Sequence, residues 1–254
     1  FGQVAESFIN KLIYEKKDFD LSITSRQDTH QIEINNLKIT SYQFNNDKSD
    51  SSIIKKLEEA NYILISIPPI DGKDIVANYI DTNLKKITNC KWITYLSATS
   101  VYGDHKGEWV NEKSATKPTS PNGVSRLEAE NIWKSLSLKN NYPLQIFRLA
   151  GIYSNEFNIL KRLQTGRAQL VDKKNHFFSR IHVEDIANIL FSSLDNFKNN
   201  EIYNICDDKP ASQIEVAAYG AKLLKLDKPN SVKLEEIESE MLKNFYKDSK
   251  KVDN

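Results

Sequence analysis

The residues of this chain that could move a proton gather in one stretch, Lys91–Lys134. An apolar run ends there in the hydroxyl residues Ser97 and Thr99, and Tyr102 and His105 follow in a loop before the next helical pattern. A hydroxyl can donate a hydrogen bond to a carbonyl oxygen, whereas a phenol or an imidazole can act as acid or base. Open α/β sheets bind ligands where buried strands end in small polar residues, so we predict a catalytic or binding site in this stretch.

Each of these side chains has a structural alternative. Ser97 and Thr99 flank Ala98 at the end of a strand. Successive side chains of a strand point to opposite faces, so neither residue simply takes over the direction of the Ala98 side chain. Tyr102 could instead be a packed ring with a satisfied hydroxyl, and His105 a solvated loop residue. We take Ser97, Thr99 and Tyr102 as catalytic candidates with these alternatives open.

A second group of residues suits a phosphate-rich cofactor. The chain opens with the residues FGQVA and continues into a helical pattern, so that Gly2 and Ala5 match the second and third positions of a G-x-G-x-x-G/A fingerprint. A helix start without proline offers free backbone N–H groups to an anion. On this interpretation the first glycine and its strand lie upstream of Phe1; an ordinary helix start is the alternative.

The end of the next strand bears on cofactor type. Phe19–Thr24 reads as a short strand that closes with Ser25 and Arg26. In dinucleotide-binding units an acidic residue about 20 residues beyond the glycines holds the ribose 2′-hydroxyl, whereas an arginine suits a 2′-phosphate. The guanidinium of Arg26 therefore predicts NADP(H) in preference to NAD(H), with a solvated surface arginine as the alternative.

Alternating strand and helix signals position these groups. Apolar runs at Asn61–Ile67, Lys91–Ala98 and Pro143–Ile152 are separated by helical patterns such as Asp74–Ile87, which predicts an α/β fold with a doubly wound parallel sheet. Pro68 and Pro69 stop the first run and form either a rigid edge for a nucleotide or a plain strand-terminating turn. Beyond Gly151 the pattern loosens, and we expect a smaller second lobe.

Composition narrows the classes of protein. The 254 residues include 39% hydrophobic and 27% charged residues, ordinary for a globular protein, and Lys+Arg 35 against Asp+Glu 34 gives a net charge of +1. That balance predicts no nucleic-acid or membrane partner, and no apolar run is long enough for a transmembrane helix. Cys90 and Cys206 fit no metal or redox spacing, so we expect reduced thiols, no metal and a cytoplasmic location.

Together these segments resemble the extended short-chain dehydrogenase/reductase superfamily of nucleotide-sugar epimerases and dehydratases. The motifs FGQVA, ISIPP, YLSATSVYGD, PTSPNGVSRLEAE, FRLAGIYS, FSRIHVEDIA and EIYNICDD follow the family's order over nearly the whole chain. The chain is most similar to an atypical subgroup of NAD(P)-dependent epimerase/dehydratase-like proteins without the usual catalytic tyrosine. The resemblance implies a Rossmann-type NAD(P)-binding domain over residues 1–152, with its first strand missing, and a small C-terminal substrate lobe over 153–254 that shares elements with the main sheet.

The family's catalytic residues are only partly present. The family places Ser or Thr four residues before the Tyr of its VYG and Tyr-x-x-x-Lys on the following helix, where this chain has Ala98, Asn122 and Arg126. Asn122 has no titratable proton near neutral pH. Arg126 can hydrogen-bond a ribose hydroxyl but does not shuttle protons. The resemblance thus supports a cofactor-holding role and leaves the proton donor open.

The resemblance assigns cofactor contacts to residues at six strand or helix ends: Gly2, Gln3, Val4, Ser25, Arg26, Ser66, Ile67, Pro68, Pro69, Ala98, Arg126, Leu149 and Ala150. We expect an oxidoreductase or epimerase with a non-standard active site that acts on a small molecule, with sugar nucleotides as candidates; a homodimer is compatible with this class. The alternative is a non-catalytic NADP(H)-binding redox-responsive regulator or partner-binding module. The missing Tyr and Ser/Thr favour that alternative, whereas the lobe that would cover a substrate favours an enzyme.

Overall fold

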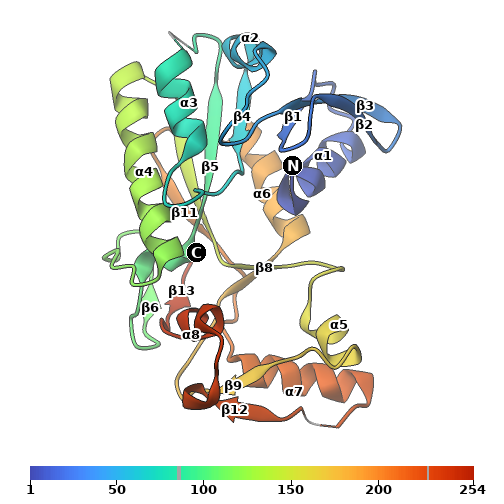
Figure 1. Ribbon diagram of the computed structural model, residues 1–254, viewed down its shortest axis with the longest axis vertical. Coiled ribbons are helices and arrows are strands. Elements are labelled where there is room, and N and C mark those ends of the chain that lie inside the picture. Colours follow the sequence, from blue (N-terminus) through green and yellow to red (C-terminus); the bar gives the residue numbers. More distant parts are fainter. Residues whose placement is uncertain (85–86, 228) are drawn as a thin grey trace. The chain divides into compact units, whose positions relative to one another are not determined.

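The chain folds into two compact units in the computed structural model, which describes residues 1–84, 87–227 and 229–254 (Figure 1). The first unit consists of residues 1–97, 128–147 and 183–202, and the second of 98–127, 148–182 and 203–254. The units are interleaved in sequence, and the predicted division into residues 1–152 and 153–254 with shared elements stays a prediction. Residues 183–202 in particular, which follow the predicted boundary, pack within the first unit.

The main sheet has four strands in the order β11-β7-β5-β4: β4 (Tyr62–Ile65), β5 (Trp92–Ala98), β7 (Leu144–Leu149) and β11 (Ile202–Ile205). β4 and β5 pair in parallel, with Ile63 opposite Ile93. Every residue of β7 and all of β5 except its last are buried, as expected for strands covered on both faces. The predicted α/β fold with a parallel sheet is therefore confirmed.

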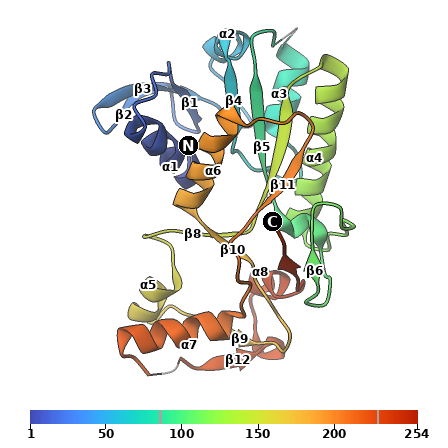
Figure 2. The same cartoon turned by 180° about the vertical axis from the view of Figure 1, so that it is seen from behind.

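Helices cover both faces of this sheet in the first unit (Figures 1 and 2). The bounds are α1 (Gln3–Tyr14), α2 (Ser52–Glu59), α3 (Ile75–Asn83), α4 (Pro121–Asn140) and α6 (Val183–Asp195). Trp92 stacks on Phe8 of α1 at 6.3 Å between ring centroids, and its indole N–H donates to Ser193 Oγ of α6. Tyr95 stacks on Trp133 of α4 at 6.1 Å. Because successive strand residues alternate, β5 sends its side chains to both helical layers.

The N-terminus of α3 is fixed by Asp74, whose carboxylate accepts hydrogen bonds from the backbone N–H groups of Val76 and Ala77. The indole N–H of Trp133 donates to the other carboxylate oxygen of Asp74 at 2.9 Å, which ties α3 to α4. The helix predicted over Asp74–Ile87 ends at Asn83, and residues 85–86 lie outside the described residues.

A separate three-stranded sheet follows α1, in the order β1-β3-β2. Its strands are β1 (Ser22–Ser25), β2 (His30–Ile34) and β3 (Leu37–Gln43), with β1 and β3 parallel and β2 antiparallel to β3. The sequence analysis did not predict β2. Asn35 and Asn36 both have positive φ, which suits the tight turn of a β2–β3 hairpin.

The second unit is built from short strand pairs and helices. The pairs are β6 (Trp109–Val110) with β13 (Lys251–Val252), β8 (Gly151–Tyr153) with β10 (Arg180–His182), and β9 (Leu170–Asp172) with β12 (Ser231–Lys233). The helices are α5 (Ile159–Gln164), α7 (Gln213–Leu224) and α8 (Glu240–Phe245), with the 3₁₀ turns η1 (Thr99–Tyr102) and η2 (Leu234–Glu236). Gly220 lets α7 approach α5 closely, because a Cβ there would lie 3.0 Å from Leu160 Cδ2.

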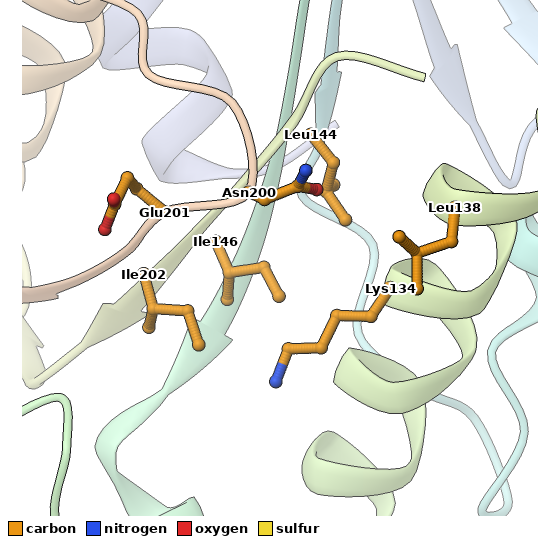
Figure 3. A pocket seen from close by; sticks show the side chains of 7 residues that line it. All are labelled: Lys134, Leu138, Leu144, Ile146, Asn200, Glu201 and Ile202. Atoms are coloured by element: carbon orange, nitrogen blue, oxygen red, sulfur yellow. The ribbon is translucent and has the colours of Figure 1, made fainter. Parts of the chain in front are cut away.

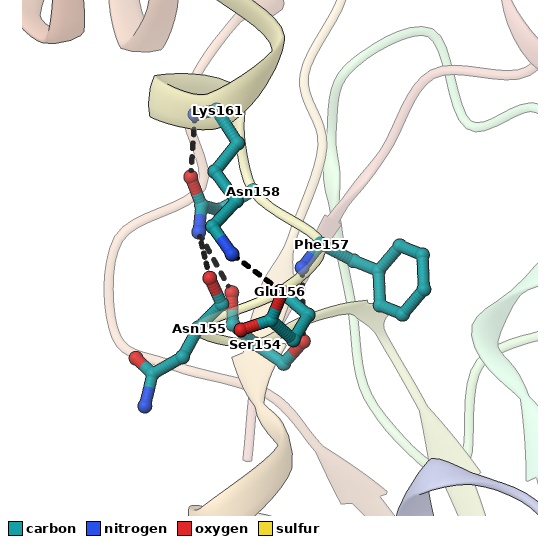
Figure 4. Close-up of polar contacts among 6 residues, drawn as sticks. All are labelled: Ser154, Asn155, Glu156, Phe157, Asn158 and Lys161. Atoms are coloured by element: carbon teal, nitrogen blue, oxygen red, sulfur yellow. Dashed lines mark hydrogen bonds and ion pairs between the residues drawn. The ribbon is translucent and has the colours of Figure 1, made fainter.

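The loop before α5 is held by its own hydrogen bonds (Figure 4). The amide oxygen of Asn158 accepts from the backbone N–H of Lys161 at 3.0 Å and so caps the helix. The Asn158 amide nitrogen donates to the carbonyl oxygens of Ser154 and Asn155, and Lys161 Nζ pairs with Glu156. The lobe therefore has a defined helix start at this point.

Three further features bear on the sequence predictions. No helix of the described segments is long and apolar enough to cross a membrane. Within the same segments, no cluster of three or more His, Cys, Asp or Glu side chains could hold a metal ion. Cys90 and Cys206 are free thiols, and burial raises the pKa of Cys90 to about 11 and that of Cys206 to about 12, so both stay protonated at neutral pH.

Candidate functional site

The start of α1 offers backbone N–H groups to an anion. Gly2 lies just before the helix with extended backbone angles, φ −140° and ψ 174°, and no side chain of the described residues caps the helix. A Cβ at Gly2 would meet nothing within 4 Å. Neither the backbone angles nor the local packing requires a glycine here, which leaves close approach of a ligand as a reason for it. Gln3 is exposed, and Val4 packs in the core.

An open pocket of about 320 Å³ lies in the first unit at the end of β1. Ser25, Arg26 and residues of the small sheet line it together with the start of the chain: Phe1, Ile23, Ser25, Arg26, Gln27, His30, Ile32 and Ser41. Ser41 Oγ donates to Ser25 Oγ at 3.0 Å, and Arg26 is exposed. Burial, and secondly the charge of Arg26, lower the pKa of the Phe1 amino group. The pocket therefore has a mixed polar and apolar lining and carries the positive charge of Arg26.

The segment after β4 contains four predicted cofactor contacts. Ser66 and Ile67 are half-buried, Pro68 is exposed and Pro69 is half-buried. All of them follow the end of β4 at Ile65, in the irregular stretch before α3. Their assignment to the cofactor stays a prediction.

Ser97 makes its hydrogen bond inside the first unit. Its hydroxyl donates to Glu130 Oε1 of α4 at 2.7 Å, and both residues are buried. Lys134 Nζ lies 3.8 Å from the other carboxylate oxygen of Glu130. The Ser97 hydroxyl is therefore directed at α4, an arrangement that favours a structural role over proton donation.

In the second unit, η1 lies directly against the first turn of α4. A Cβ on Gly123 would be 2.6 Å from the carbonyl oxygen of Ser100, so only glycine permits this approach. Asn122 is exposed, and Arg126 is half-buried one turn further along α4. Ala98, the last residue of β5, and Thr99, the first residue of η1, are half-buried. The structure thus brings the predicted residues at the end of β5 close to those at the start of α4.

Ser100 was not among the sequence-predicted residues. Its hydroxyl oxygen is buried, and no hydrogen-bond partner for it occurs in the described parts of the chain. The hydroxyl of neighbouring Thr99 likewise has no hydrogen bond to a described residue, and Thr99 is half-buried. Neither hydroxyl is therefore engaged by a described residue, and that of Thr99 is the more accessible of the two.

Tyr102 lies in a closed polar network. Its hydroxyl donates to Asn204 Oδ1 at 2.7 Å and accepts from Arg148 Nη1 at 3.0 Å, and the ring is fully buried. The Arg148 guanidinium carbon is also 4.9 Å from the ring centroid. Glu112 accepts from the backbone N–H of Asn204 at 2.7 Å. Every member of the network except Glu112 is buried, and the tyrosine hydroxyl has both partners that it needs.

This environment governs the protonation of Tyr102. Burial raises the pKa of the Tyr102 phenol, while the charge and the hydrogen bond of Arg148 and the hydrogen bond of Asn204 act in the opposite direction. The phenol therefore keeps its proton near neutral pH. A catalytic role for Tyr102 stays a prediction, and its contacts favour a positioning role.

The remaining residues around η1 bind backbone groups. His105 Nε2 lies 3.2 Å from the carbonyl oxygens of both Tyr102 and Ala115, so this nitrogen carries the hydrogen. Leu149 and Ala150 are buried at the end of β7, and the Ala150 N–H donates to the carbonyl oxygen of Ile205 at 3.0 Å. Sequence reasoning missed Arg148 and Asn204, although the first of them stood out as a charge within an apolar run.

A second cavity contains none of the predicted site residues (Figure 3). It has a volume of about 280 Å³ and lies between α4 and the strands β7 and β11, lined by Lys134, Leu138, Leu144, Ile146, Asn200, Glu201 and Ile202. Its lining is largely aliphatic, and among the residues described there no hydroxyl residue lies beside its two charged residues, Lys134 and Glu201. We do not assign the cofactor to it.

The fold and the polar groups at the strand ends define a Rossmann-type α/β protein. A family model described as "NAD dependent epimerase/dehydratase family" matches residues 75–206, and the chain belongs to this family. A search of curated proteins found no match.

Solved structures agree with this placement. A functionally unknown conserved protein from Silicibacter pomeroyi is 30% identical over 100% of this chain and 86% of its own, with a TM-score of 0.85. The UDP-N-acetylglucosamine 4-epimerase from Bacillus cereus is 19% identical over 99% and 86%, with a TM-score of 0.70. The dTDP-glucose 4,6-dehydratase from Bacillus anthracis, solved in complex with NAD, is 15% identical over 99% and 84%, with a TM-score of 0.73. The latter two likenesses concern the fold.

Proposed function

We propose that this chain is an NADP(H)-binding oxidoreductase or epimerase with a non-standard active site. The observation that carries the proposal is the pocket at the end of β1, where Ser25 and Arg26 lie together. In this proposal Arg26 binds the 2′-phosphate, and the open helix start at Gly2 binds the pyrophosphate. Gln3, Val4 and the segment Ser66–Pro69 are assigned to the rest of the adenosine diphosphate.

The nicotinamide half is assigned to the residues that the family resemblance gives for it. Arg126 would hydrogen-bond the ribose hydroxyls, and Ala98, Leu149 and Ala150 would pack near the ring. A bound nicotinamide supplies or accepts a hydride at the substrate carbon. The exposed position of Asn122 leaves room on the helix surface where the family carries its tyrosine.

The hydrogen-bond donor to the substrate oxygen is assigned to the hydroxyl residues of η1, and the proton that this oxygen gains would come from water. Thr99 is the candidate retained from the sequence, and Ser100 joins it because its hydroxyl has no described partner. We assign Ser97 and Tyr102 to positioning, since their hydroxyls bond to Glu130 and to Asn204. A threonine or serine hydroxyl is a weak acid, so it would act by donating a hydrogen bond to a developing oxyanion.

The substrate is proposed to be a small molecule, with a sugar nucleotide as the first class to test. The support is the similarity in fold to epimerases and dehydratases of nucleotide sugars. The free thiols Cys90 and Cys206 favour a reducing compartment such as the cytoplasm. The second candidate function is an NADP(H)-binding regulator without hydride chemistry, which Ala98 and Asn122 favour because they replace two catalytic side chains.

The test is a fluorescence titration of the chain with NADPH and with NADH. We expect tighter binding of NADPH, and about a 10-fold or larger loss for NADPH alone in Arg26→Gln, because a charge-assisted contact to phosphate is lost. Lys38→Gln, on β3 and outside the pocket, is the control for a lost surface charge. Equal affinity for both nucleotides would contradict the NADP(H) assignment. Oxidation of NADPH with candidate sugar nucleotides then separates the enzyme from the regulator.

A further inference from the structure

We infer that His30 is a second, pH-dependent determinant of NADP(H) binding, which recognises the 2′-phosphate together with Arg26. This inference rests on the proposed function and names a residue that neither the sequence motifs nor the family assignment singles out. His30 lines the same pocket as Ser25 and Arg26. Its place follows from the β2–β3 hairpin, which was not predicted.

Strand register brings His30 to the pocket. Ser41 of β3 lies opposite Ile23 of β1 on one side and opposite His30 of β2 on the other, so these three residues form one row across the small sheet. Residues directly opposite each other in a sheet share a face. Ser25 lies two residues beyond Ile23 and therefore points to the same face. The hairpin thus places an imidazole on the face that carries the Ser25 hydroxyl.

The orientation of the imidazole is set by the backbone. His30 Nδ1 lies 2.6 Å from the carbonyl oxygen of Asp28. A carbonyl oxygen only accepts hydrogen bonds, so Nδ1 carries a hydrogen in both the neutral and the charged ring. Protonation therefore takes place at Nε2. That nitrogen is an acceptor in the neutral ring, which repels a phosphate oxygen, and a charged donor in the protonated ring, which binds one.

Two hydroxyl groups complete the arrangement. Ser41 Oγ donates to Ser25 Oγ, and the hydrogen of the Ser25 hydroxyl has no acceptor among the described residues. Ser25 can therefore donate to a phosphate oxygen while Ser41 polarises it. Arg26 supplies the permanent charge, Ser25 a neutral donor and His30 a donor that depends on pH.

Other charged groups near His30 are few and have partners. The Asp28 carboxylate accepts from Gln43 Nε2, and the Asp50 carboxylate accepts from Thr29 Oγ1. The amino group of Phe1 lines the pocket with Arg26 and donates to the carbonyl oxygen of Thr24. All of these groups are unchanged in a variant of His30, so a comparison with that variant isolates the imidazole.

The experiment is calorimetric titration of the full chain with 2′,5′-ADP and with 5′-AMP at pH 6 and pH 8. Their affinity ratio isolates the 2′-phosphate, because both carry the 5′-phosphate. We expect the ratio of the wild-type chain to be about 5 to 10 times larger at pH 6 than at pH 8, in line with one charge-assisted hydrogen bond. In His30→Gln the ratio should fall at pH 6 and stay level or rise toward pH 8, because the phosphate itself gains charge over this range.

Two variants complete the test. His30→Lys carries its charge at both pH values and should keep the high ratio at pH 8. Gln31→Ala changes the neighbouring β2 residue on the opposite face and should match the wild-type chain. A pH dependence that is identical in the wild-type chain and His30→Gln, with selectivity still lost in Arg26→Gln, would overturn the role of His30 and leave the proposed function standing. A wild-type chain that does not distinguish the two ligands at either pH would overturn both.

Discussion

Replacing Tyr102 by phenylalanine separates a positioning role from a catalytic one. The substitution removes only the hydroxyl, so that in a buried site Asn204 Oδ1 loses the donor Tyr102 and Arg148 Nη1 loses its hydrogen bond to Tyr102. Each buried polar group that loses a hydrogen bond costs about 1–3 kcal/mol, so the two groups together predict a loss of about 2–6 kcal/mol in the free energy of unfolding. For a chain of this length that loss lowers Tm by about 4–24 °C.

The assay is thermal unfolding followed by circular dichroism, with Tyr142→Phe as the matched control. The Tyr142 ring is also buried, at 3% exposed, but its hydroxyl makes no hydrogen bond to the described residues, so the control should change Tm by no more than about 2 °C. NADPH affinity and substrate turnover are measured on the same samples below their Tm. We expect stability to fall in Tyr102→Phe while turnover per folded molecule is kept within about threefold, because a hydroxyl with both partners inside the protein donates nothing to a substrate.

The opposite pattern would refute this reasoning. If Tyr102→Phe has the same Tm as the control variant but has lost turnover, the Tyr102 phenol takes part in catalysis. The catalytic role predicted from the sequence would then hold, and the network around Arg148 would have to open during the reaction.

Three further substitutions test other parts of the account. Gly103→Ala should lower the free energy of unfolding by at least about 3 kcal/mol in chemical denaturation. The reason is that φ at Gly103 is +71° and the new Cβ would lie too close to the carbonyl oxygen of Lys117. A denaturation midpoint near that of the wild-type chain would show that this turn adapts. Ser97→Ala should lower the free energy of unfolding by about 1–3 kcal/mol, because Glu130 loses a buried donor, and should leave NADPH affinity unchanged. A loss of NADPH affinity with unchanged stability would instead assign Ser97 to the cofactor site. Burial lowers the pKa of His176 from 6.5 to about 4. As pH drops below about 6.5, the unfolded chain therefore binds a proton at this residue before the folded chain does. The free energy of unfolding falls as a result, by up to about 3 kcal/mol near pH 4. His176→Gln should flatten that dependence in denaturation curves measured from pH 7 to pH 4, and an equally steep decline would assign it to other groups.

Much of the fold could be predicted because its determinants are local. Continuous apolar runs marked β5 and β7, and both are buried as central parallel strands. The β2–β3 hairpin was missed even though Asn35 and Asn36 separate two stretches of alternating residues, a usual signal for a tight turn. The interleaving of the two units was beyond local patterns, since it depends on which faces of distant helices pack together.

The candidate site was predictable only in part. Strand ends and helix starts could be placed from the sequence, and with them the neighbourhood of Ser25, Arg26 and Arg126. The direction of a hydroxyl could not, because it depends on a partner far along the chain: Ser97 turns to Glu130, and Tyr102 turns to Asn204. His30 was missed for the same reason, as its position depends on the register of a strand that was not predicted.

A crystal structure of the chain soaked with NADP⁺ tests the central claim most directly. We expect the 2′-phosphate to lie within about 3 Å of the Arg26 guanidinium and the Ser25 hydroxyl, and the pyrophosphate to lie over the N–H groups that follow Gly2. A nucleotide bound elsewhere, or one whose 2′-phosphate points into solvent away from Arg26, would contradict it.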